Sequence, residues 1–524
     1  MRISRMLAIL CLASALVPAQ TPIKVGTRLV QVDVVVRDKN GPVHGLTDKD
    51  FELFDRGKLR KIALFGASTA APGDAPSHPL APNVVSNRID RAGSPITNVT
   101  AILLDRLNTS SADQAWATQE VLKVLRSLQP GDRVALFTLS KTVRVLADFT
   151  ADPERVRAAL SRMGPEHSFD LAASDGRDEN GILPDSEIPV TGDPETDLAT
   201  ERSVAEMRLT ALEGRVEITA RGMRLLARHL GGLPGRKNLI WISSSFPLTH
   251  QERDRGSATL GITPAVRALN EANVAVYPVD PRGLEPGLLL ASTNGLIGVR
   301  PPRPTTLGPS GVDTMNLLAR ETGGRAFYNS NDMIGAVRAA LDDAQATYVL
   351  GFYPDENELD DRFHSLKVKV TGSGIETHHR AGYFAGSSAP LTDPQRRSAL
   401  RNVFTTPLEA TGVGLSAVVQ PVKSDPGKSM ISISVNMSDL QPEPQGDRWV
   451  VAMELATLSS VSKPAKLRTE AITLSLSGDQ LRQAIEQGYI LQRPIQTNGA
   501  KGVVRIALQG RTTGAVGSVT LPIR

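Results

Sequence analysis

The sequence predicts a multidomain protein in which an α/β domain with a doubly wound, mostly parallel sheet is inserted in a β-sandwich and followed by a C-terminal β-sandwich. Strand and helix patterns alternate over residues 97–346, which is typical of a parallel sheet with helices on both faces. Strand patterns alone flank this region over 22–67 and 347–384, and they return over 400–524. A chain of 524 residues is long enough for several domains.

The first residues have the pattern of a secretory signal peptide. Two arginines precede an apolar run from Met6 to Val17, and Ala19 offers a small residue for cleavage. A buried first helix would also be apolar, but this order of charge, apolar run and small residue favours an export signal. We therefore expect residues 1–19 to be removed and the mature protein to be exported, to the periplasm or outside the cell.

The composition excludes several classes of protein. Cys11 is the only cysteine and lies in the expected signal peptide, so disulfides, zinc–thiolate sites and cysteine nucleophiles are not expected. The formal net charge is +4, and Arg2 and Arg5 of the signal supply part of it, so charge gives no argument for a nucleic-acid partner. No later stretch has the roughly 18 continuous apolar residues of a membrane helix. We expect no integral membrane segment after signal cleavage.

The two flanking segments carry strand patterns. Valines occupy every second position from Val30 to Val36, which is the period of a half-buried strand. Neither 22–67 nor 347–384 alone has enough strands to bury a core. We therefore expect both segments to form one discontinuous β-sandwich. Residues 68–96 are rich in Pro, Ala and Ser and are expected to be a linker.

The central region alternates strand and helix. A buried strand ends at Asp105, a tight hairpin follows as an antiparallel edge, and further βα units complete the region. A long helix has apolar residues at helical spacing. The expected helices are Ala112–Leu128, Pro153–Met163, Thr200–His229, Val266–Ala272, Met315–Glu321 and Asp332–Gln345, and the expected strands are ILLD, VALFTLS, VRVLADFT, NLIWIS, VAVYPVD and RAFYN.

The last part of the chain is strand-rich. Over residues 400–524, short apolar runs such as MISISVNM, WVVAMELATL and GVVRIALQG are separated by Gly, Pro and Asp. Regular short strands with such turns argue for a second sandwich.

The central succession resembles the von Willebrand factor A (VWA) domain over about Asn98–Ala346. The phrases NGPVHGLTDKDFELFDRGK, VAVYPVDPRGL, LARETGGRAFYNSNDM and YVLGFYPDENELDDRFHSLKVKV, with HHRAGYFA after them, are similar to exported "VWFA-related acidobacterial" proteins. This resemblance implies a VWA domain set between β segments, in a family whose biochemical role is largely undefined.

The resemblance also implies a metal site, of which only part is present. VWA domains bind a divalent cation through Asp-x-Ser-x-Ser after the first strand, a later Thr, and an Asp after the fourth strand. Asp105 matches the first Asp and Thr109 can supply the last hydroxyl, whereas Leu107 stands at the first serine position. The fourth strand ends in serines, Ser243 and Ser244 among them, with no carboxylate.

We therefore expect a degenerate metal site and no resident cofactor. Mg²⁺ needs about six oxygens, so Mg²⁺ or Ca²⁺ at Asp105 and Thr109 would be weakly held. The alternative is that Asp105 caps the next helix or bonds backbone at the strand end. Asp280 follows the fifth strand, two strands and so about 10 Å away from Asp105 at roughly 4.8 Å per strand, which is too far to share one ion.

The loops at this edge of the sheet are expected to form a ligand-binding rim. Residues 164–198 contain ten acidic residues against Arg177, and a solvated acidic loop is the simplest interpretation. The segments 247–261 and 283–312 are the other outsized loops. The rim residues that we expect to contact a ligand are Asn108, Ser243, Ser244, Asp280 and Arg282.

Signals for an enzyme are weak. No HExxH, GxSxG or Walker sequence occurs, and serines 243–245 near His250 lack an indicated third partner for a hydrolase. His378 and His379 are neighbours in a strand and point to opposite faces, while His364 is expected to pack or form hydrogen bonds at a strand start. We expect a non-enzymatic binding or adhesion-type protein that holds a protein or cell-surface ligand. A structural component of the cell envelope is the alternative, and a hydrolase is the third.

Overall fold

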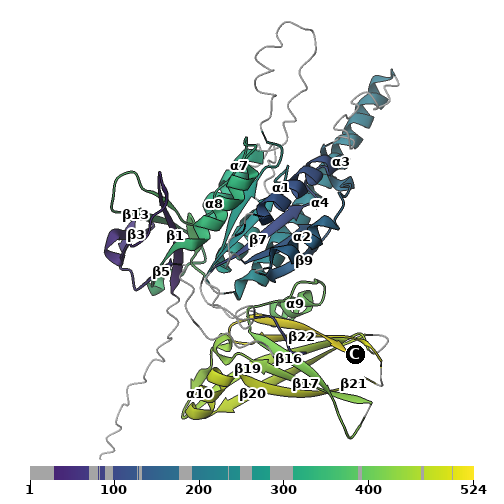
Figure 1. Cartoon of the computed structure of the whole chain (residues 1–524). Helices are drawn as coiled ribbons and strands as arrows, with labels where there is room; N and C mark the ends of the chain where they lie inside the picture. Colours follow the sequence, from purple (N-terminus) through teal and green to yellow (C-terminus); the bar gives the residue numbers. More distant parts are fainter. Residues whose placement is uncertain are drawn as a thin grey trace, which may run out of the picture.

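The computed structural model describes the chain in three folded units (Figure 1). The described residues are 29–69, 81, 83–88, 98–126, 128, 133–150, 152–175, 192–233, 235–247, 262–283, 311–386, 392–425, 427–461, 465–497 and 500–523. The expected signal peptide, residues 176–191 of the acidic loop and most of the expected rim loops 247–261 and 283–312 lie outside these residues. None of the described helices is both long and apolar enough to cross a membrane.

The α/β domain has a doubly wound sheet at its centre. The described strands are arranged in the order β11-β10-β7-β8-β9, and β9 is the antiparallel edge strand that the hairpin pattern predicts. Numbered within the domain and read from the β9 edge, this order is 3-2-1-4-5, which is a doubly wound arrangement. The strands are β7 (Asn98–Asp105), β8 (Val134–Leu139), β9 (Val143–Thr150), β10 (Arg236–Ile242) and β11 (Val274–Val279).

Helices cover both faces of this sheet. Alternate residues of β7 enter different cores: Ala101 and Leu103 pack with Met223 of α4, while Ile102 and Leu104 pack on the other face with Val121 of α1. Burial on both faces explains why the strand is a continuous apolar run. The helices are α1 (Ser111–Arg126), α2 (Pro153–Ser161), α3 (Phe169–Asp175), α4 (Pro194–Gly231), α5 (Ile262–Glu271), α7 (Gly311–Thr322) and α8 (Met333–Gln345).

Part of the expected acidic loop is helical. Within residues 164–198 the chain forms α3 and the start of α4, which begins earlier than the expected Thr200. Asp193 accepts a hydrogen bond from the backbone N–H of Thr196, and Pro194 stands in the first turn. This is a favoured helix start. The first residues of α4 are thus helical where a loop was expected, and they remain mostly exposed to solvent.

The N-terminal β domain contains strands from both flanking segments. β1 (Val30–Asp38) pairs with β12 (Ala346–Phe352), and β12 pairs with β5 (Leu64–Thr69). β3 (Phe51–Asp55) of the second sheet pairs with β13 (Phe363–Val370). One apolar core lies between the sheets. The remaining strands are β2 (Gly41–Pro42), β4 (Lys58–Arg60), β14 (Glu376–His378) and β15 (Gly382–Phe384), and the 3₁₀ helices are η1 (Asp48–Asp50) and η4 (Glu356–Glu358).

The C-terminal β domain packs two sheets around a third apolar core. One has the order β21-β17-β16-β6 and the other β18-β19-β22-β23, with β20 paired to β19. The strands are β6 (Val85–Ser86), β16 (Leu415–Pro421), β17 (Lys428–Val435), β18 (Glu443–Gln445), β19 (Arg448–Ser459), β20 (Lys466–Leu476), β21 (Tyr489–Gln496), β22 (Gly502–Gly510) and β23 (Val516–Ile523).

Two features of this domain differ from the expectation. The linker expected over 68–96 contains β6, which pairs with β16, so part of it belongs to a sheet. The region also contains the helices α9 (Asp393–Val403) and α10 (Gly478–Gln487), together with the 3₁₀ helix η5 (Met437–Leu440). Both α-helices start with a capping box, a local signal that the strand pattern around them obscured.

Polar contacts fix the α/β domain to both β domains. Asn273 Nδ2 donates to Asp33 Oδ2 of the N-terminal β domain at 2.7 Å. On the other side, Thr411 Oγ1 donates to the His229 carbonyl at 2.7 Å and accepts from the Gly232 N–H at 2.9 Å. These bonds join the end of α4 to the C-terminal β domain.

Candidate functional site

Asp105 lies at the carboxyl end of β7, beside the point where the strand order reverses. It is only 2 % exposed, and both of its carboxylate oxygens accept hydrogen bonds. Oδ1 accepts from the backbone N–H groups of Leu107 at 3.1 Å and Asn108 at 3.0 Å. Oδ2 accepts from Asn108 Nδ2 at 2.8 Å, Trp241 Nε1 at 2.9 Å and Ser243 Oγ at 3.1 Å. Four N–H donors and the Ser243 hydroxyl, which shares its hydrogen with the Ser245 carbonyl at 2.6 Å, therefore surround this carboxylate.

The charge on Asp105 is held at an electrostatic cost. Burial raises the pKa of the Asp105 carboxyl above its ordinary value, although hydrogen bonds from Asn108, Trp241 and Ser243 act in the opposite direction. These hydrogen bonds thus offset the cost of burying the carboxylate, and the carboxylate oxygens are not free to bind a ligand.

Asn108 connects Asp105 to the long helix α4. Its Nδ2 donates to Thr219 Oγ1 at 2.9 Å, and its Oδ1 accepts from Arg215 Nε at 3.0 Å. Arg215 is only 1 % exposed, and its Nη2 donates to Ser245 Oγ at 3.1 Å. Residues four apart share one helix face, so Arg215 and Thr219 reach Asn108 together. The helix therefore brings a guanidinium cation into the site.

Thr109 is buried beside this cluster and bonds the neighbouring strand end. Its Oγ1 accepts from the Ser244 N–H at 3.3 Å, and Ser244 Oγ donates to Asp113 Oδ2 at 2.8 Å. The hydroxyl expected as a metal ligand thus holds the end of β10 against the start of α1.

These residues do not fit the divalent cation of a VWA metal site. Such an ion needs about six oxygens, whereas the Asp105 oxygens already accept five N–H or O–H donors. Leu107 is buried in the core without an oxygen to offer, and Ser243 stands where a second carboxylate would be needed. Within the part of the chain that the structure describes, no group of three His, Cys, Asp or Glu side chains could hold a metal. The geometry corresponds to the alternative in which Asp105 bonds backbone at the strand end.

The structure corrects the expected ligand rim. Asn108 and Ser243 are completely buried, so neither can touch a partner, and Ser244 is half-buried. Asp280 is held by Arg282, whose Nε and Nη2 donate to its two oxygens at 3.0 and 2.7 Å. Asp280 follows β11, two strands from β7, and belongs to a separate ion pair. The patterns located the edge of the sheet, but they did not reveal which side chains turn inward.

Three site residues were missed by the sequence interpretation: Arg215, Thr219 and Trp241. Trp241 lies in the expected strand NLIWIS and is buried, and its indole N–H donates to Asp105. Arg215 and Thr219 continue the buried face of α4 through Gly222 and Leu226. The signal in the sequence was an arginine at the same helical spacing as the apolar residues of α4, which indicates a buried side chain.

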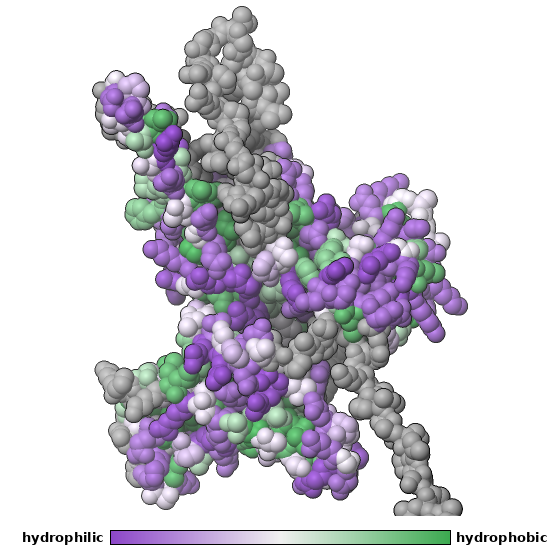
Figure 2. All heavy atoms as spheres, turned by 180° about the vertical axis from the view of Figure 1, so that it is seen from behind, coloured by the Kyte–Doolittle hydropathy of each residue, from purple (hydrophilic) through white to green (hydrophobic). Residues whose placement is uncertain are grey.

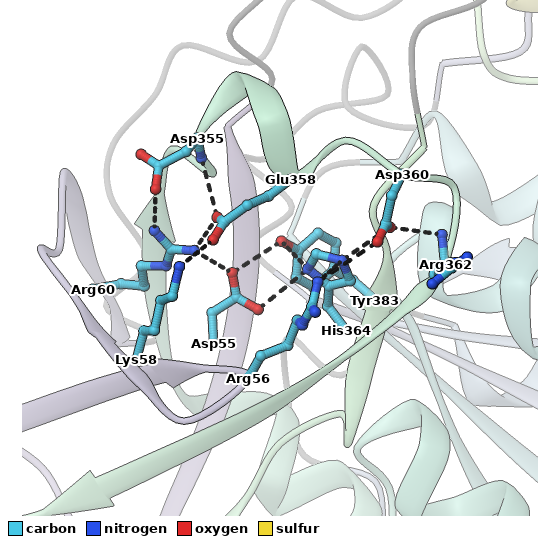
Figure 3. Close-up of polar contacts among 10 residues, drawn as sticks. All are labelled: Asp55, Arg56, Lys58, Arg60, Asp355, Glu358, Asp360, Arg362, His364 and Tyr383. Atoms are coloured by element: carbon cyan, nitrogen blue, oxygen red, sulfur yellow. Dashed lines mark hydrogen bonds and ion pairs between the residues drawn. The ribbon is translucent and has the colours of Figure 1, made fainter.

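A second buried polar cluster lies in the N-terminal β domain (Figure 3). Asp55, at the end of β3, is fully buried, and its Oδ2 accepts from Arg60 at 3.0 Å and from the Tyr383 hydroxyl at 3.3 Å. His364 lies 3.4 Å from Asp55 Oδ1 and 3.0 Å from Asp360 Oδ1 through its two ring nitrogens. His364 therefore packs and forms hydrogen bonds at the start of β13, as expected.

This cluster ties a loop to a hairpin. Arg60 of β4 also bonds Asp355 and Glu358 of the loop around η4. Hydrogen bonds from Lys58 and Arg60 lower the pKa of Glu358 to about 2. Because Asp55 and His364 are shut off from solvent, the arrangement holds the loop in place and offers no access to a substrate.

The comparisons with known proteins give a fold likeness only. No protein-family model and no curated protein matches the chain. Solved structures that match include a von Willebrand factor type A protein from Catenulispora acidiphila, with 9 % identity and a TM-score of 0.24, covering 90 % of this chain and 75 % of that one.

Two further matches each cover about half of this chain. An aerotolerance-related membrane protein from Bacteroides fragilis has 14 % identity and a TM-score of 0.24, covering 47 % of this chain and 99 % of that one. The proximal thread matrix protein 1 from the mussel byssus has 10 % identity and a TM-score of 0.23, covering 48 % of each chain. At such scores these likenesses carry no argument about fold or function. The doubly wound arrangement of the α/β domain rests on its own strand order.

Proposed function

We propose that the protein is an exported, non-enzymatic binding protein whose VWA-like domain, inserted in a β-sandwich, holds a protein partner without a metal ion. The observation that carries the proposal is a helical arm formed by α3 and the first half of α4, which we call the arm (residues 169–175 and 194–214). It projects from the edge of the sheet at which Asp105 lies (Figure 1).

The arm is long and contributes few buried residues to the core of the α/β domain. α4 has 38 residues, about 57 Å at 1.5 Å per residue, and its first fully buried residue is Arg215. Large apolar side chains are exposed on the arm: Phe169 is 78 %, Met207 61 % and Leu198 48 % exposed. Figure 2 shows such hydrophobic patches among hydrophilic residues on the projecting part. Leu198 and Met207 are nine residues apart and so lie on opposite faces of α4. Exposed apolar side chains on more than one face of a projection favour a protein-binding role.

The buried Asp105 cluster supports the arm as a rigid element. Arg215 and Thr219 lie directly after the arm on α4, and both bond Asn108. At the place where VWA domains bind a metal, this chain thus has side chains that hold α4, the helix that carries the arm. Because Asp105 is buried and fully bonded, a partner's carboxylate would find no metal cation there, and the Arg215 guanidinium is itself buried.

The metal part of the proposal is tested by titration calorimetry of the mature protein with MgCl₂ and MnCl₂. We expect no binding in the micromolar range, because the donors at Asp105 would have to be displaced first. Micromolar binding that Asp105→Ala abolishes would contradict the proposal.

The partner is tested by cross-linking and capture from the envelope and medium of the native host. We expect capture that EDTA leaves unchanged and that the double substitution Phe169→Ser and Met207→Ser weakens at least tenfold. Ile490→Ser, at an equally exposed apolar residue of the C-terminal β domain, is the matched control. Capture that is lost with EDTA would overturn metal independence. Capture that the arm variant leaves intact would favour the alternative, an envelope component without a ligand on this domain.

A further inference from the structure

The C-terminal β domain contains a cavity of about 420 Å³ between its two sheets. This volume lies within the roughly 300–1,000 Å³ of ligand cavities in proteins. The cavity opens between β20 and β21. Each of these strands pairs with only one neighbour among the described strands, β19 and β17 respectively. The sheets are therefore not closed by backbone at this side.

The floor of the cavity is aliphatic. Ile431 of β17, Leu455 of β19 and Val504 of β22 line it, and all three are buried members of the domain core. Ile495 of β21 adds a fourth branched side chain, while Thr457, Ser459, Thr469 and Gln496 add polar uncharged groups to the walls. Among the described lining residues no aromatic ring is present, so the cavity suits a flexible hydrocarbon chain better than a flat ring that needs stacking.

The opening of the cavity carries excess positive charge. Arg493 of β21 donates from Nε and Nη2 to the two oxygens of Glu470 of β20 at 2.8 and 2.7 Å. These two charges neutralise each other across the opening. Arg468 lies two residues before Glu470, on the same face of β20, and also lines the cavity. Within the described part of the chain, no carboxylate forms an ion pair with Arg468.

We propose that this cavity binds an amphipathic monoanion, a fatty-acid carboxylate with a medium-length chain. The hydrocarbon chain lies on the aliphatic floor, and the carboxylate pairs with the Arg468 guanidinium, whose planar donors match a carboxylate. This site is separate from the arm and does not depend on the proposed function.

The test is titration calorimetry of the full mature chain with sodium hexanoate, octanoate and decanoate below their micellar concentrations. Affinity should rise about fourfold for each added methylene, because burying one methylene is worth about 0.8 kcal/mol. Neutral 1-octanol should bind at least tenfold more weakly than octanoate, because it cannot form the ion pair.

Two substitutions place the ligand in the cavity. Arg468→Gln should weaken octanoate about tenfold, the equivalent of about 1.4 kcal/mol, and should leave 1-octanol unchanged. Thr457→Phe should abolish binding, since position 457 lines the cavity. Arg482→Gln is the control, because Arg482 is exposed on α10 and outside the cavity. Thermal unfolding verifies that each variant is folded.

The proposal is overturned by an absence of saturable binding, or by affinity that is independent of chain length. It is equally overturned if octanoate binds the wild type and Arg468→Gln alike. The chain-length series needs no variant, so it decides the matter even if Thr457→Phe fails to fold.

Discussion

Replacing Asn108 by leucine should destabilise the α/β domain far more than the change in volume would suggest. Leucine has the same branching and the same number of side-chain heavy atoms as asparagine, although its methyl groups are bulkier than an amide oxygen and nitrogen. The substitution therefore removes the polar contacts and adds some packing strain. The Asn108 side chain donates to Asp105 and Thr219 and accepts from Arg215, all within 3.0 Å. It is completely buried, so water cannot take over these bonds.

The size of the expected destabilisation follows from the three groups that lose their hydrogen bond to Asn108: Asp105, Thr219 and Arg215. Two of the three lost bonds involve charged groups, at roughly 1.5–3 kcal/mol each, and the third is a neutral bond at about 1 kcal/mol. Allowing for relaxation, we expect a loss of about 3–6 kcal/mol in the free energy of unfolding. A typical domain has about 5–15 kcal/mol in total, so the loss is a large share.

The loss should also depend on pH. Burial already raises the pKa of Asp105, and the hydrogen bonds from Asn108 oppose that rise more strongly than those from Trp241 and Ser243. The leucine variant keeps the backbone N–H bond to Asp105 and loses the side-chain bond, which is the larger of the two effects on the pKa. The charged form is therefore less favoured in the folded state. A raised folded pKa gives stability at low pH that is lost as pH rises through that pKa. The difference between Asn108→Leu and wild type should therefore grow as pH rises above 3.8, the ordinary pKa of the aspartate carboxyl.

Guanidinium chloride unfolding measures the free energy, and hydrogen exchange of peptides from β7 and β10 assigns the change to the α/β domain. Asn316→Leu, at an exposed position of α7 with a single bond to Tyr328, is the control and should change stability by at most about 0.5 kcal/mol. A double-mutant cycle with Arg215→Met should give a coupling of about 1 kcal/mol or more. A loss below about 1 kcal/mol for Asn108→Leu, or additive effects in the cycle, would refute the reasoning.

Two further predictions concern the β domains. Gly232→Ala should loosen the contact between α4 and the C-terminal β domain, because the new Cβ would lie 1.6 Å from the Thr411 carbonyl oxygen. Gly231→Ala is the control, because its Cβ would meet only Ala272 at 3.5 Å. Limited proteolysis between the domains should be faster for Gly232→Ala alone, and equal rates would contradict this. Glu358→Gln should remove an acid-sensitive contribution to stability. The lowered pKa of Glu358 stabilises the fold above pH 4.5, and this stabilisation is lost as pH falls towards about 2. The melting temperature of wild type should therefore fall more steeply over that pH range than the melting temperature of the variant.

Local pattern was sufficient where the physical cause is local. The apolar run before Asp105 predicted a strand buried on both faces, and β7 enters two cores by alternate residues. The hairpin after α1 predicted the antiparallel edge strand β9. The helix that begins at Pro194 and the two capped helices of the C-terminal β domain show the limit of the same method, because a few capping residues were outweighed by the composition around them.

The sequence by itself determined that Asp105 stands at the carboxyl end of a central strand with too few oxygens near it in the chain to hold a metal ion. Only the tertiary structure decided what surrounds that carboxylate. Arg215 is 107 residues from Asn108, and Trp241 is 136 residues from Asp105. Periodicity and capping act over a few residues, so they define elements. A buried charge is satisfied by whichever donors the packing of those elements brings within about 3 Å, and no spacing along the chain encodes that distance.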